Sequence, residues 1–390
     1  MKKKLIIYLG NFGEPEANAA GKRVYGNALI FKRLGYRVVL IGKGNDNSEY
    51  PFCYEEGIEY YAFPNYNIYK IGNYIKYINT VIEKVGEPRI IVRYGSPGLA
   101  VFDRSLIRFC KKKKIILVSD VVDWLPASGG NLIFNAIKTI DTYLEKAVYN
   151  KKSDGIIAIS SYLSNYYKGK GCKTVVIPPI VSEFQENKGR NAIITIVYAG
   201  IPFRLGKQVK HPDKVKDRLD LAVRSLAEAI RRGCNVVFDI YGVTKEQYLT
   251  AYPMDSEILK GMEDTIQFHG KVAMKTVQRA INKADFTILL REKNRATMAG
   301  FPTKVVESIS CGTPVITTRT SDLDKYINNG DTGYFVDIEK QDTIADQLVH
   351  IIHLDAYELH RVKDKCYRSR KFLYYSYINE INSFIETLIR

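Results

Sequence analysis

The chain has 390 residues and carries 58 lysines and arginines against 42 acidic residues, a formal net charge of +16. This length suits two domains of ordinary size better than one core. No run of about 18 apolar residues occurs, so the sequence predicts no membrane span. We interpret the basic start with its short apolar run as a first buried strand rather than a signal peptide.

Cysteine and histidine usage argues against a metal centre. The six cysteines and five histidines lack the paired spacings that zinc sites and disulfide frameworks show. We therefore expect no metal and no cofactor. Reduced cysteines fit a cytoplasmic protein.

Much of the positive charge lies in three lysine-rich clusters of the first half, at 111–114, 151–152 and 168–173. A single charge run is often only a solvated loop. Three clusters in one half favour a basic surface with an anionic partner. Nucleic acid, an anionic membrane and a phosphorylated substrate all fit that charge.

In chain order, the first half alternates apolar runs with helical patterns. Strands are predicted at 4–10, 36–42, 89–95, 114–120 and 154–160, and a helix over 23–35 that stops at Gly35. Continuous valine, isoleucine and leucine runs joined by helices are typical of a parallel sheet covered on both faces.

The second half repeats this pattern. Strands are predicted at 192–200, 235–242, 265–270, 284–291, 313–318 and 332–337, with a helix over 218–233. The polar segment after Pro178-Pro179 is typical of a linker. The expected fold class is α/β, with two doubly wound parallel-sheet Rossmann-like domains facing a central cleft. The expected boundaries are 1–181, a linker at 182–191, 192–370, and a C-terminal helix at 371–390 packing back across the domains.

The stretch AGFPTKVVESISCGTPVITT, residues 299–318, predicts a helix that begins near Thr303. Lys304 in its first turn opposes the helix dipole, unless an anion binds there. Glu307 lies one position too late for a capping box but could accept hydrogen bonds from vicinal hydroxyls. Phosphate plus diol suggests a nucleotide ribose. The alternative is an exposed salt bridge between Lys304 and Glu307.

The stretch from 301 to 336, FPTKVVESISCGTPVITTRTSDLDKYINNGDTGYFV, resembles the donor-site region of retaining glycosyltransferases with the GT-B fold, specifically glycosyltransferase family 4. The resemblance extends over nearly the whole chain. It includes YAGIP with KDRLDLAVRSL, TIQFHGKV, and IAISSYL with VVIPPIV, in the family's order. It implies an acceptor-binding first domain and a nucleotide-sugar-binding second domain.

Three residues take catalytic roles by this resemblance. Lys216 occupies the place of the lysine that binds the donor diphosphate, and Arg291 sits near the same phosphates. Glu307 corresponds to the glutamate that holds the ribose. One departure concerns Ala299, where the family usually has a glutamate that contacts the donor sugar.

The resemblance also implies a donor-binding set. Gly200 would let the backbone approach the diphosphate. His269 lies beside the base strand, with a packed structural histidine as the alternative. Arg204 and Lys207, in an insertion at 203–215, are rival phosphate ligands. The helix start contributes Gly300, Phe301, Pro302, Thr303 and Lys304, where backbone amides of 300–303 would replace the missing glutamate.

Two segments of the first domain are expected on the acceptor side. The first joins strand to helix at 10–24 and contains Gly13 and Arg23, with a mobile surface loop as the alternative. The second, at 120–131, contains Asp123, which resembles a residue facing the acceptor. Trp124 would stack on a sugar or belong to the core.

A helical stripe at 68–85 is read first as core packing. Its polar side carries Tyr66, Lys70, Asn73 and Tyr77, and tyrosine with lysine suits a membrane headgroup region. Peripheral contact of the basic first domain with the inner face of an anionic cytoplasmic membrane is therefore a hypothesis of this sequence.

The function implied is sugar transfer from a nucleotide-sugar donor to a glycan or lipid-linked acceptor, with retention and without a metal. Bacterial surface polysaccharide synthesis, such as capsule, lipopolysaccharide or exopolysaccharide, is the expected setting. The alternatives are a GT-B sugar-nucleotide epimerase or phosphorylase and a nucleic-acid binder. No recognised nucleic-acid module occurs, so we expect no nucleic acid partner. The absence of GxGxxG after a strand disfavours an oxidoreductase.

Overall fold

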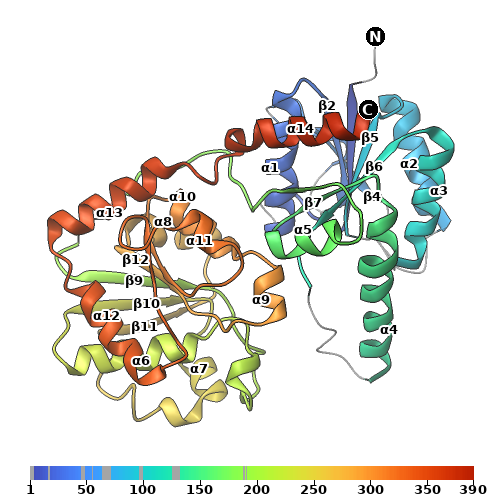
Figure 1. Ribbon diagram of the computed structural model, residues 1–390. Helices are drawn as coiled ribbons and strands as arrows, with labels where there is room; N and C mark the ends of the chain where they lie inside the picture. Colours follow the sequence, from blue (N-terminus) through green and yellow to red (C-terminus); the bar gives the residue numbers. More distant parts are fainter. Residues whose placement is uncertain are drawn as a thin grey trace. The chain divides into compact units, whose positions relative to one another are not determined.

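The computed structural model describes residues 4–15, 18–44, 49–54, 56–63, 72–95, 100–124, 132–187, 189 and 191–390. The chain divides into two compact units (Figure 1). Unit 1 comprises Met1–Ser182, Ala299–Phe301 and Phe372–Arg390, and unit 2 comprises Glu183–Met298 and Pro302–Lys371. Each unit is built around one sheet.

Unit 1 holds an eight-stranded sheet in the order β3-β4-β2-β1-β5-β6-β7-β8. Its strands are β1 (Leu5–Gly10), β2 (Arg37–Lys43), β3 (Phe52–Cys53), β4 (Glu59–Phe63), β5 (Ile90–Tyr94), β6 (Ile116–Val121), β7 (Gly155–Ala158) and β8 (Thr174–Val176). Neighbours pair in parallel except β3 with β4. The five strands predicted for this half are confirmed. β3, β4 and β8 were missed because they are short and only partly apolar.

Helices cover both faces of this sheet. They are α1 (Ala19–Arg33), α2 (Gly72–Val85), α3 (Asp103–Lys113), α5 (Ser161–Lys168) and α14 (Ile378–Ile389). A further helix, α4 (Leu132–Tyr143), is mostly exposed over residues 135–143. Short turns are η1 (Ala100–Phe102), η2 (Leu144–Tyr149), η3 (Asn150–Lys152) and η7 (Tyr374–Tyr377). Ile6 and Tyr8 pack on one side of the sheet, and Leu5 and Ile7 on the other. This two-sided burial explains the unbroken apolar run of β1.

Unit 2 holds an all-parallel sheet in the order β11-β10-β9-β12-β13-β14. Its strands are β9 (Ile194–Ala199), β10 (Val236–Tyr241), β11 (Ile266–Gly270), β12 (Phe286–Leu289), β13 (Val315–Thr317) and β14 (Gly333–Phe335). All were predicted. Its helices are α6 (Leu219–Arg231), α7 (Lys245–Ala251), α8 (Met274–Lys283), α9 (Arg295–Ala299), α10 (Thr303–Ser310), α11 (Leu323–Tyr326), α12 (Ile344–Ile352) and α13 (Ala356–Ser369), with η4 (Pro212–Lys214), η5 (Pro253–Asp255) and η6 (Gln341–Thr343).

The predicted α/β class with two doubly wound sheets is confirmed, and each sheet has a point where the chain reverses its direction of winding. In unit 1 the reversal lies between β1 and β5, and in unit 2 it lies between β9 and β12. Loops that leave such neighbouring strands diverge, and ligands of doubly wound proteins bind in the crevice that results. A ligand site is therefore expected at these two points.

Two features bear on function class. Within the described ranges, no helix has both the length and the apolarity needed to cross a membrane. The same residues contain no group of three or more histidine, cysteine, aspartate or glutamate side chains arranged to hold a metal. The six cysteines are free thiols.

Candidate active site

A buried carboxylate lies at the reversal point of unit 2. Asp217, just before α6, is 4% exposed. One of its oxygens, Oδ1, is 2.7 Å from Arg291 Nε, and the other, Oδ2, is 2.5 Å from Lys304 Nζ. Arg291 follows β12 and Lys304 lies in the first turn of α10. Segments that are distant in sequence thus bring two cations to one carboxylate.

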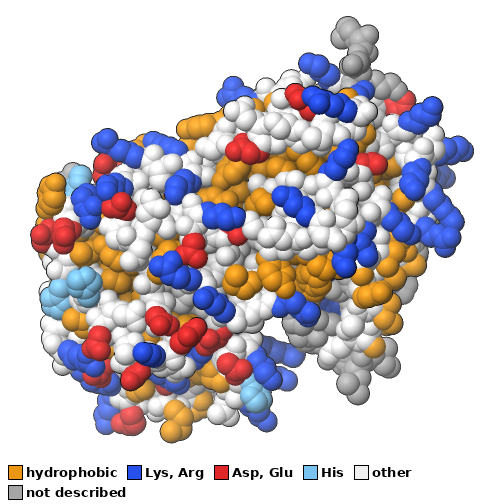
Figure 2. All heavy atoms as spheres, in the orientation of Figure 1, with side chains coloured by type: hydrophobic (Ala, Val, Ile, Leu, Met, Phe, Trp, Pro, Cys, Tyr) orange, Lys and Arg blue, Asp and Glu red, His pale blue; other side chains and the backbone are white. Residues whose placement is uncertain are grey.

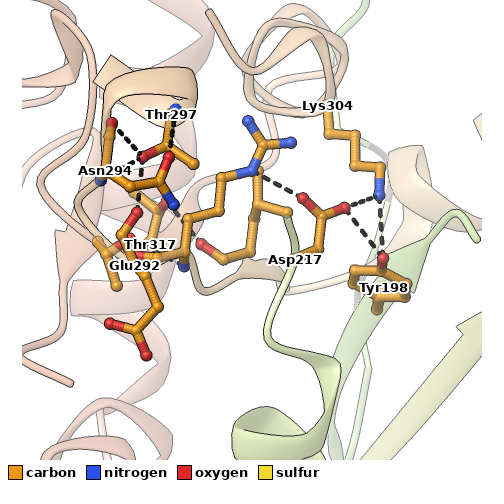
Figure 3. A network of polar contacts seen from close by, with 10 residues as sticks. Tyr198, Asp217, Glu292, Asn294, Thr297, Lys304 and Thr317 are labelled. Atoms are coloured by element: carbon orange, nitrogen blue, oxygen red, sulfur yellow. Dashed lines mark hydrogen bonds and ion pairs between the residues drawn. The ribbon is translucent and has the colours of Figure 1, made fainter. Parts of the chain in front are cut away.

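Tyr198, on β9, completes this network (Figure 3). Its hydroxyl donates to Asp217 Oδ2 at 3.1 Å and accepts from Lys304 Nζ at 3.0 Å. The ammonium of Lys304 also lies 4.4 Å from the centroid of the Tyr198 ring, a cation–π distance. Figure 3 shows Asp217 directed at both Tyr198 and Lys304. We call these four residues, including Arg291, the Asp217 network.

Electrostatics in the network favour the charged pair. Burial disfavours a carboxylate, but Lys304 and Arg291 outweigh it and hold the pKa of Asp217 well below its usual range. Burial lowers the pKa of Lys304, and Asp217 acts against that effect. Nearby positive charge from Lys216 and Arg291 lowers the Lys304 pKa further. Asp217 therefore favours the charged form of this lysine.

Glycines make room at the strand ends. Gly200, after β9, has φ +149°, and a Cβ there would lie 2.2 Å from Lys304 Nζ. Gly242, after β10, has φ +110°, and a Cβ there would lie 2.4 Å from the carbonyl oxygen of Gly200. A diphosphate was predicted to approach the Gly200 backbone closely. In the structure the group that lies close to Gly200 is the Lys304 ammonium.

The start of α10 offers its positive end without a side-chain cap. The helix spans Thr303–Ser310, as predicted, and the preceding Pro302 makes no capping hydrogen bond. Val305, Val306 and Ile309 form its buried side. Glu307 is half-buried and lines the same small cavity as Lys304. The two residues singled out from the sequence therefore share one space.

Arg291 is held by its backbone as well as by Asp217. Its N–H donates to Thr318 Oγ1 at 3.0 Å, and the same hydroxyl donates to the Arg291 carbonyl at 2.8 Å. The loop that follows is braced by Thr297, whose hydroxyl donates to the Glu292 carbonyl at 2.6 Å (Figure 3). A pocket of about 400 Å³ opens beside Arg291 at the carboxyl ends of β12, β13 and β14. That volume is in the range of small-ligand sites.

The other predicted cations of unit 2 are exposed. Lys216 precedes Asp217 and is close enough for its charge to act on Lys304. Arg204 and Lys207 lie on the inserted loop at 203–215 and are exposed. Lys216 is therefore placed with the Asp217 network, whereas no printed contact joins the inserted cations to it.

His269 is exposed but makes two contacts with neighbouring side chains. Its ring stacks on Tyr241 with centroids 4.4 Å apart and planes at 16°. Its Nε2 lies 2.6 Å from Asp239 Oδ1. These two contacts favour a structural role for His269 over a role in binding the base.

Gly300 and Phe301 belong to unit 1, whereas Pro302 and Thr303 belong to unit 2. Phe301 packs edge-on against Phe372, with ring centroids 5.9 Å apart. The proposed run of backbone donors from Gly300 to Thr303 therefore crosses a unit boundary.

In unit 1, Arg23 points into the interior. It is 3% exposed, and its Nη2 lies 2.7 Å from Asp120 Oδ1. Its Nη1 donates to the carbonyls of Ile177 and Pro178 at 2.9 and 3.2 Å. Tyr8 donates to the other oxygen of Asp120 at 2.5 Å. These contacts use the Arg23 guanidinium to join α1 to β6 and to the segment after β8. The guanidinium was expected to face a ligand, and it does not.

Gly13 is buried and lies between β1 and α1. A Cβ at Gly21, in the first turn of α1, would lie 2.7 Å from the Gly13 carbonyl oxygen. Gly13 thus packs closely on the start of α1.

Asp123 and Trp124 lie together after β6. Lys146 Nζ is 3.5 Å from Asp123 Oδ1 and 5.6 Å from the centroid of the Trp124 ring. Trp124 is half-buried and packs edge-on against Tyr166, with centroids 4.6 Å apart. The Asp123 side chain is 43% exposed, so its carboxylate remains open to solvent.

Sequence reasoning missed Asp217 and Tyr198. Asp217 directly follows Lys216 in the segment KDRLD, and Tyr198 is the last large residue before Gly200. The only local signal was an acidic residue beside a predicted phosphate ligand.

Comparison with solved structures defines the class. Sucrose-phosphate synthase of Thermosynechococcus elongatus is similar with a TM-score of 0.69 at 12% identity, covering 99% of each chain. HepE of Anabaena, in complex with UDP and glucose, is similar with a TM-score of 0.64 at 13% identity, covering 98% of this chain and 100% of that one. The chain has the GT-B fold of these structures.

Sequence comparison matches part of the chain. Residues 209–353 match the family described as glycosyl transferases group 1. N-acetyl-alpha-D-glucosaminyl L-malate synthase of Bacillus anthracis is 31% identical over 119 residues, which is 30% of this chain and 28% of that protein. Both sequence matches cover only part of the chain, and the family match lies in unit 2 apart from residues 299–301.

Proposed function

We propose that this protein transfers a sugar from a nucleoside diphosphate sugar to an acceptor hydroxyl, with retention of anomeric configuration. The observation that carries the proposal is the meeting of Arg291 and Lys304 beside the uncapped start of α10, at the reversal point of a doubly wound sheet. Two cations and a helix N-terminus form an anion site. The similar structure of HepE contains UDP and glucose, which supports a nucleoside diphosphate sugar as the donor.

The proposed reaction is a front-face substitution. The bond between the anomeric carbon and the diphosphate oxygen breaks, and its electrons pass to the leaving diphosphate. The acceptor oxygen attacks from the same face, and its proton passes to the leaving phosphate oxygen. Arg291, Lys304 and Lys216 stabilise the charge that develops there, in a site whose dipoles are already oriented. Glu307 holds the ribose hydroxyls.

Transfer is tested with a panel of sugar nucleotides and detection of the released nucleoside diphosphate. We expect turnover with one donor and loss of at least about a hundredfold in Arg291→Ala. Lys260→Ala, an exposed lysine of unit 2 remote in sequence from the site, is the control. Full activity of Arg291→Ala in a folded protein would contradict the proposal.

The acceptor side of the proposal rests on unit 1. Asp123 presents a solvent-open carboxylate, and Trp124 beside it presents an aromatic face with a cation. Such a pair suits the hydroxyls and apolar face of a sugar. We propose a glycan or lipid-linked acceptor, with bacterial surface polysaccharide synthesis as the setting. Asp123→Asn should raise the acceptor KM while leaving donor hydrolysis unchanged.

A peripheral contact with anionic membrane is the second part of the proposal. Lys111–Lys114 precede β6, Lys151 and Lys152 precede β7, and the lysines of 168–173 precede β8. Since these strands are parallel neighbours, all three clusters lie at the amino-terminal edge of the sheet. The lysines are exposed. Figure 2 shows basic side chains along the margin of unit 1 where α3 lies in Figure 1.

This edge is opposite the carboxyl ends of the strands, roughly 20 Å away along a six-residue strand. A cluster of exposed lysines at one edge suits anionic lipid headgroups. Flotation with vesicles containing anionic lipid should show binding at low salt and release at high salt. Lys→Gln changes at 111–114 should weaken it, and changes at Lys260, Lys275 and Lys340 should not. Binding that ignores both salt and the cluster would refute the contact.

The proposed membrane contact does not include the polar side of the helix predicted at 68–85. Tyr66 and Lys70 lie outside the described residues. Within α2, Ile78 and Val85 are buried in the core, as the stripe predicted.

A further inference from the structure

We infer that Asp217 is a positioning residue which fixes Lys304 over Gly200 as the principal diphosphate-binding cation of this site. The inference rests on the proposed function, in which Lys304 already belongs to the donor-binding set, and adds to it the positioning role of Asp217. It is carried by the contacts of the Lys304 ammonium.

The ammonium is held on several sides. Asp217 and the Tyr198 hydroxyl take two hydrogen bonds from Nζ at 2.5 and 3.0 Å, and the Tyr198 ring lies beneath it. An ammonium has three N–H donors. Within the described residues Lys304 uses two of them, and its side chain is 27% exposed. One donor thus remains for a ligand, from a side chain whose orientation is already fixed.

Gly200 explains why the cation must be a side chain here. The Gly200 N–H donates to the Tyr241 carbonyl at 2.8 Å, so it is not directed at a ligand. The place where its Cβ would stand is taken by the Lys304 ammonium, 2.2 Å away. At this position the Lys304 ammonium, rather than the backbone N–H of Gly200, is therefore the donor for a phosphate.

The charges fit the proposed ligand. Lys216, Arg291 and Lys304 bring three positive charges and Asp217 one negative charge, a balance of +2. The diphosphate of a nucleotide sugar carries two negative charges, and its departure as nucleoside diphosphate adds a third. Without Asp217, Arg291 and Lys304 would be two like charges in a buried site, which disfavours the protonated lysine. Asp217 thus keeps Lys304 both in place and charged.

The test is nucleoside diphosphate affinity between pH 6 and 10, measured by calorimetry with UDP, GDP and ADP on wild type and Asp217→Asn. The amide keeps the shape of Asp217 but removes the charge. In wild type the affinity falls as pH rises through the lowered pKa of Lys304. In Asp217→Asn that fall shifts to lower pH, and affinity at pH 9 drops by about tenfold or more. Lys216→Gln is the comparison variant: it should weaken binding, and because the charge of Lys216 lowers the Lys304 pKa, it should move the fall in affinity to higher pH, opposite to Asp217→Asn.

Two outcomes overturn the inference separately from the proposed function. Parallel pH profiles in wild type and Asp217→Asn would overturn the positioning role alone. Failure of wild type to bind any of the three nucleotides would overturn the proposed function together with it.

A second measurement needs no variant. In wild type, UDP should slow acetylation of the Lys304 amine severalfold, as mapped by peptide mass spectrometry, while Lys260 reacts at an unchanged rate. Equal reaction of Lys304 with and without bound UDP would contradict its role.

Discussion

The reversal points of the two units contain the same arrangement of a tyrosine, an aspartate and an arginine, but its hydrogen-bond donors are used differently. The first strand of each unit ends in Tyr-x-Gly, at Tyr8 and at Tyr198, and both glycines have φ +149°. Each tyrosine donates its hydroxyl to a buried aspartate, and each aspartate pairs with a buried arginine. The pairs are Arg23 with Asp120 and Arg291 with Asp217.

What differs is how the remaining donors are used. In unit 1 the other N–H groups of Arg23 are taken by backbone carbonyls, and a Cβ at Gly10 would lie 2.1 Å from the Tyr94 carbonyl oxygen. In unit 2 a partly exposed lysine, Lys304, enters the network, and the terminal nitrogens of Arg291 make no hydrogen bond within the described ranges. A closed network holds a sheet to its helix, and an open one keeps donors for a ligand.

Breaking the closed network should have the largest effect. Asp120→Ala leaves the Arg23 guanidinium buried without its partner, and we expect a loss of about 3–5 kcal/mol in the free energy of unfolding. Asp217→Ala should cost less, because Lys304 can turn to solvent. Urea denaturation compares the two variants. Equal losses would mean that both networks are structural.

Breaking the open network should act on the barrier of the reaction. Arg291→Ala should lower kcat by about 10²–10³, or roughly 2.7–4 kcal/mol, since it removes a cation aimed at developing charge. Steady-state kinetics with the preferred donor measures this effect. An effect confined to acceptor KM would place Arg291 outside the diphosphate site.

The two glycines sharpen the comparison. Gly10→Ala sets its Cβ against a backbone oxygen that cannot move away, so we expect lost stability, seen as a lower Tm. Gly200→Ala meets the flexible end of Lys304. We expect the ammonium to shift and nucleotide affinity to fall about tenfold, or roughly 1.4 kcal/mol. Identical changes in Tm and affinity for both variants would argue against the distinction.

Acid should weaken unit 2 through Asp217. Its pKa is lower in the folded protein than in the unfolded chain, so its contribution is complete above about pH 4 and is lost as pH falls through the folded value. Thermal unfolding at pH 6 and pH 3 should differ more in wild type than in Asp217→Asn. The same difference in both proteins would assign acid lability to other carboxylates.

The smallest effect is expected at His269. Its pairing with Asp239 is partly solvent-exposed, so His269→Ala should cost less than about 1 kcal/mol in the free energy of unfolding. With a structural role, nucleotide affinity should stay within about twofold. A larger loss of affinity would return this histidine to the base-binding role that the resemblance implies.

The sequence allowed prediction of elements whose signal is local. Every strand of unit 2 and the start of α10 at Thr303 follow from apolar runs and turn residues. The short strands β3 and β8 carry too little pattern to be recognised. An anion site at Lys304 could be predicted because a lysine in the first turn of a helix is unfavourable by itself.

The partners could not be predicted in the same way. Asp217 is 87 residues from Lys304 in sequence, and Asp120 is 97 from Arg23. Contacts at such separations depend on the sheet order, which brings the loops after β9 and β12 together. For the same reason, Arg23 was expected at a ligand and was found among carbonyls.

The central claim is that a nucleoside diphosphate binds at the open network of unit 2. Titration of the nucleotide panel into wild type and Lys304→Ala, followed by calorimetry at low and moderate salt, tests it most directly. We predict binding of one nucleotide by wild type, weaker at higher salt, and its loss by tenfold or more in the folded Lys304→Ala variant. Equal affinity in the two proteins, or no binding to either, would contradict the account.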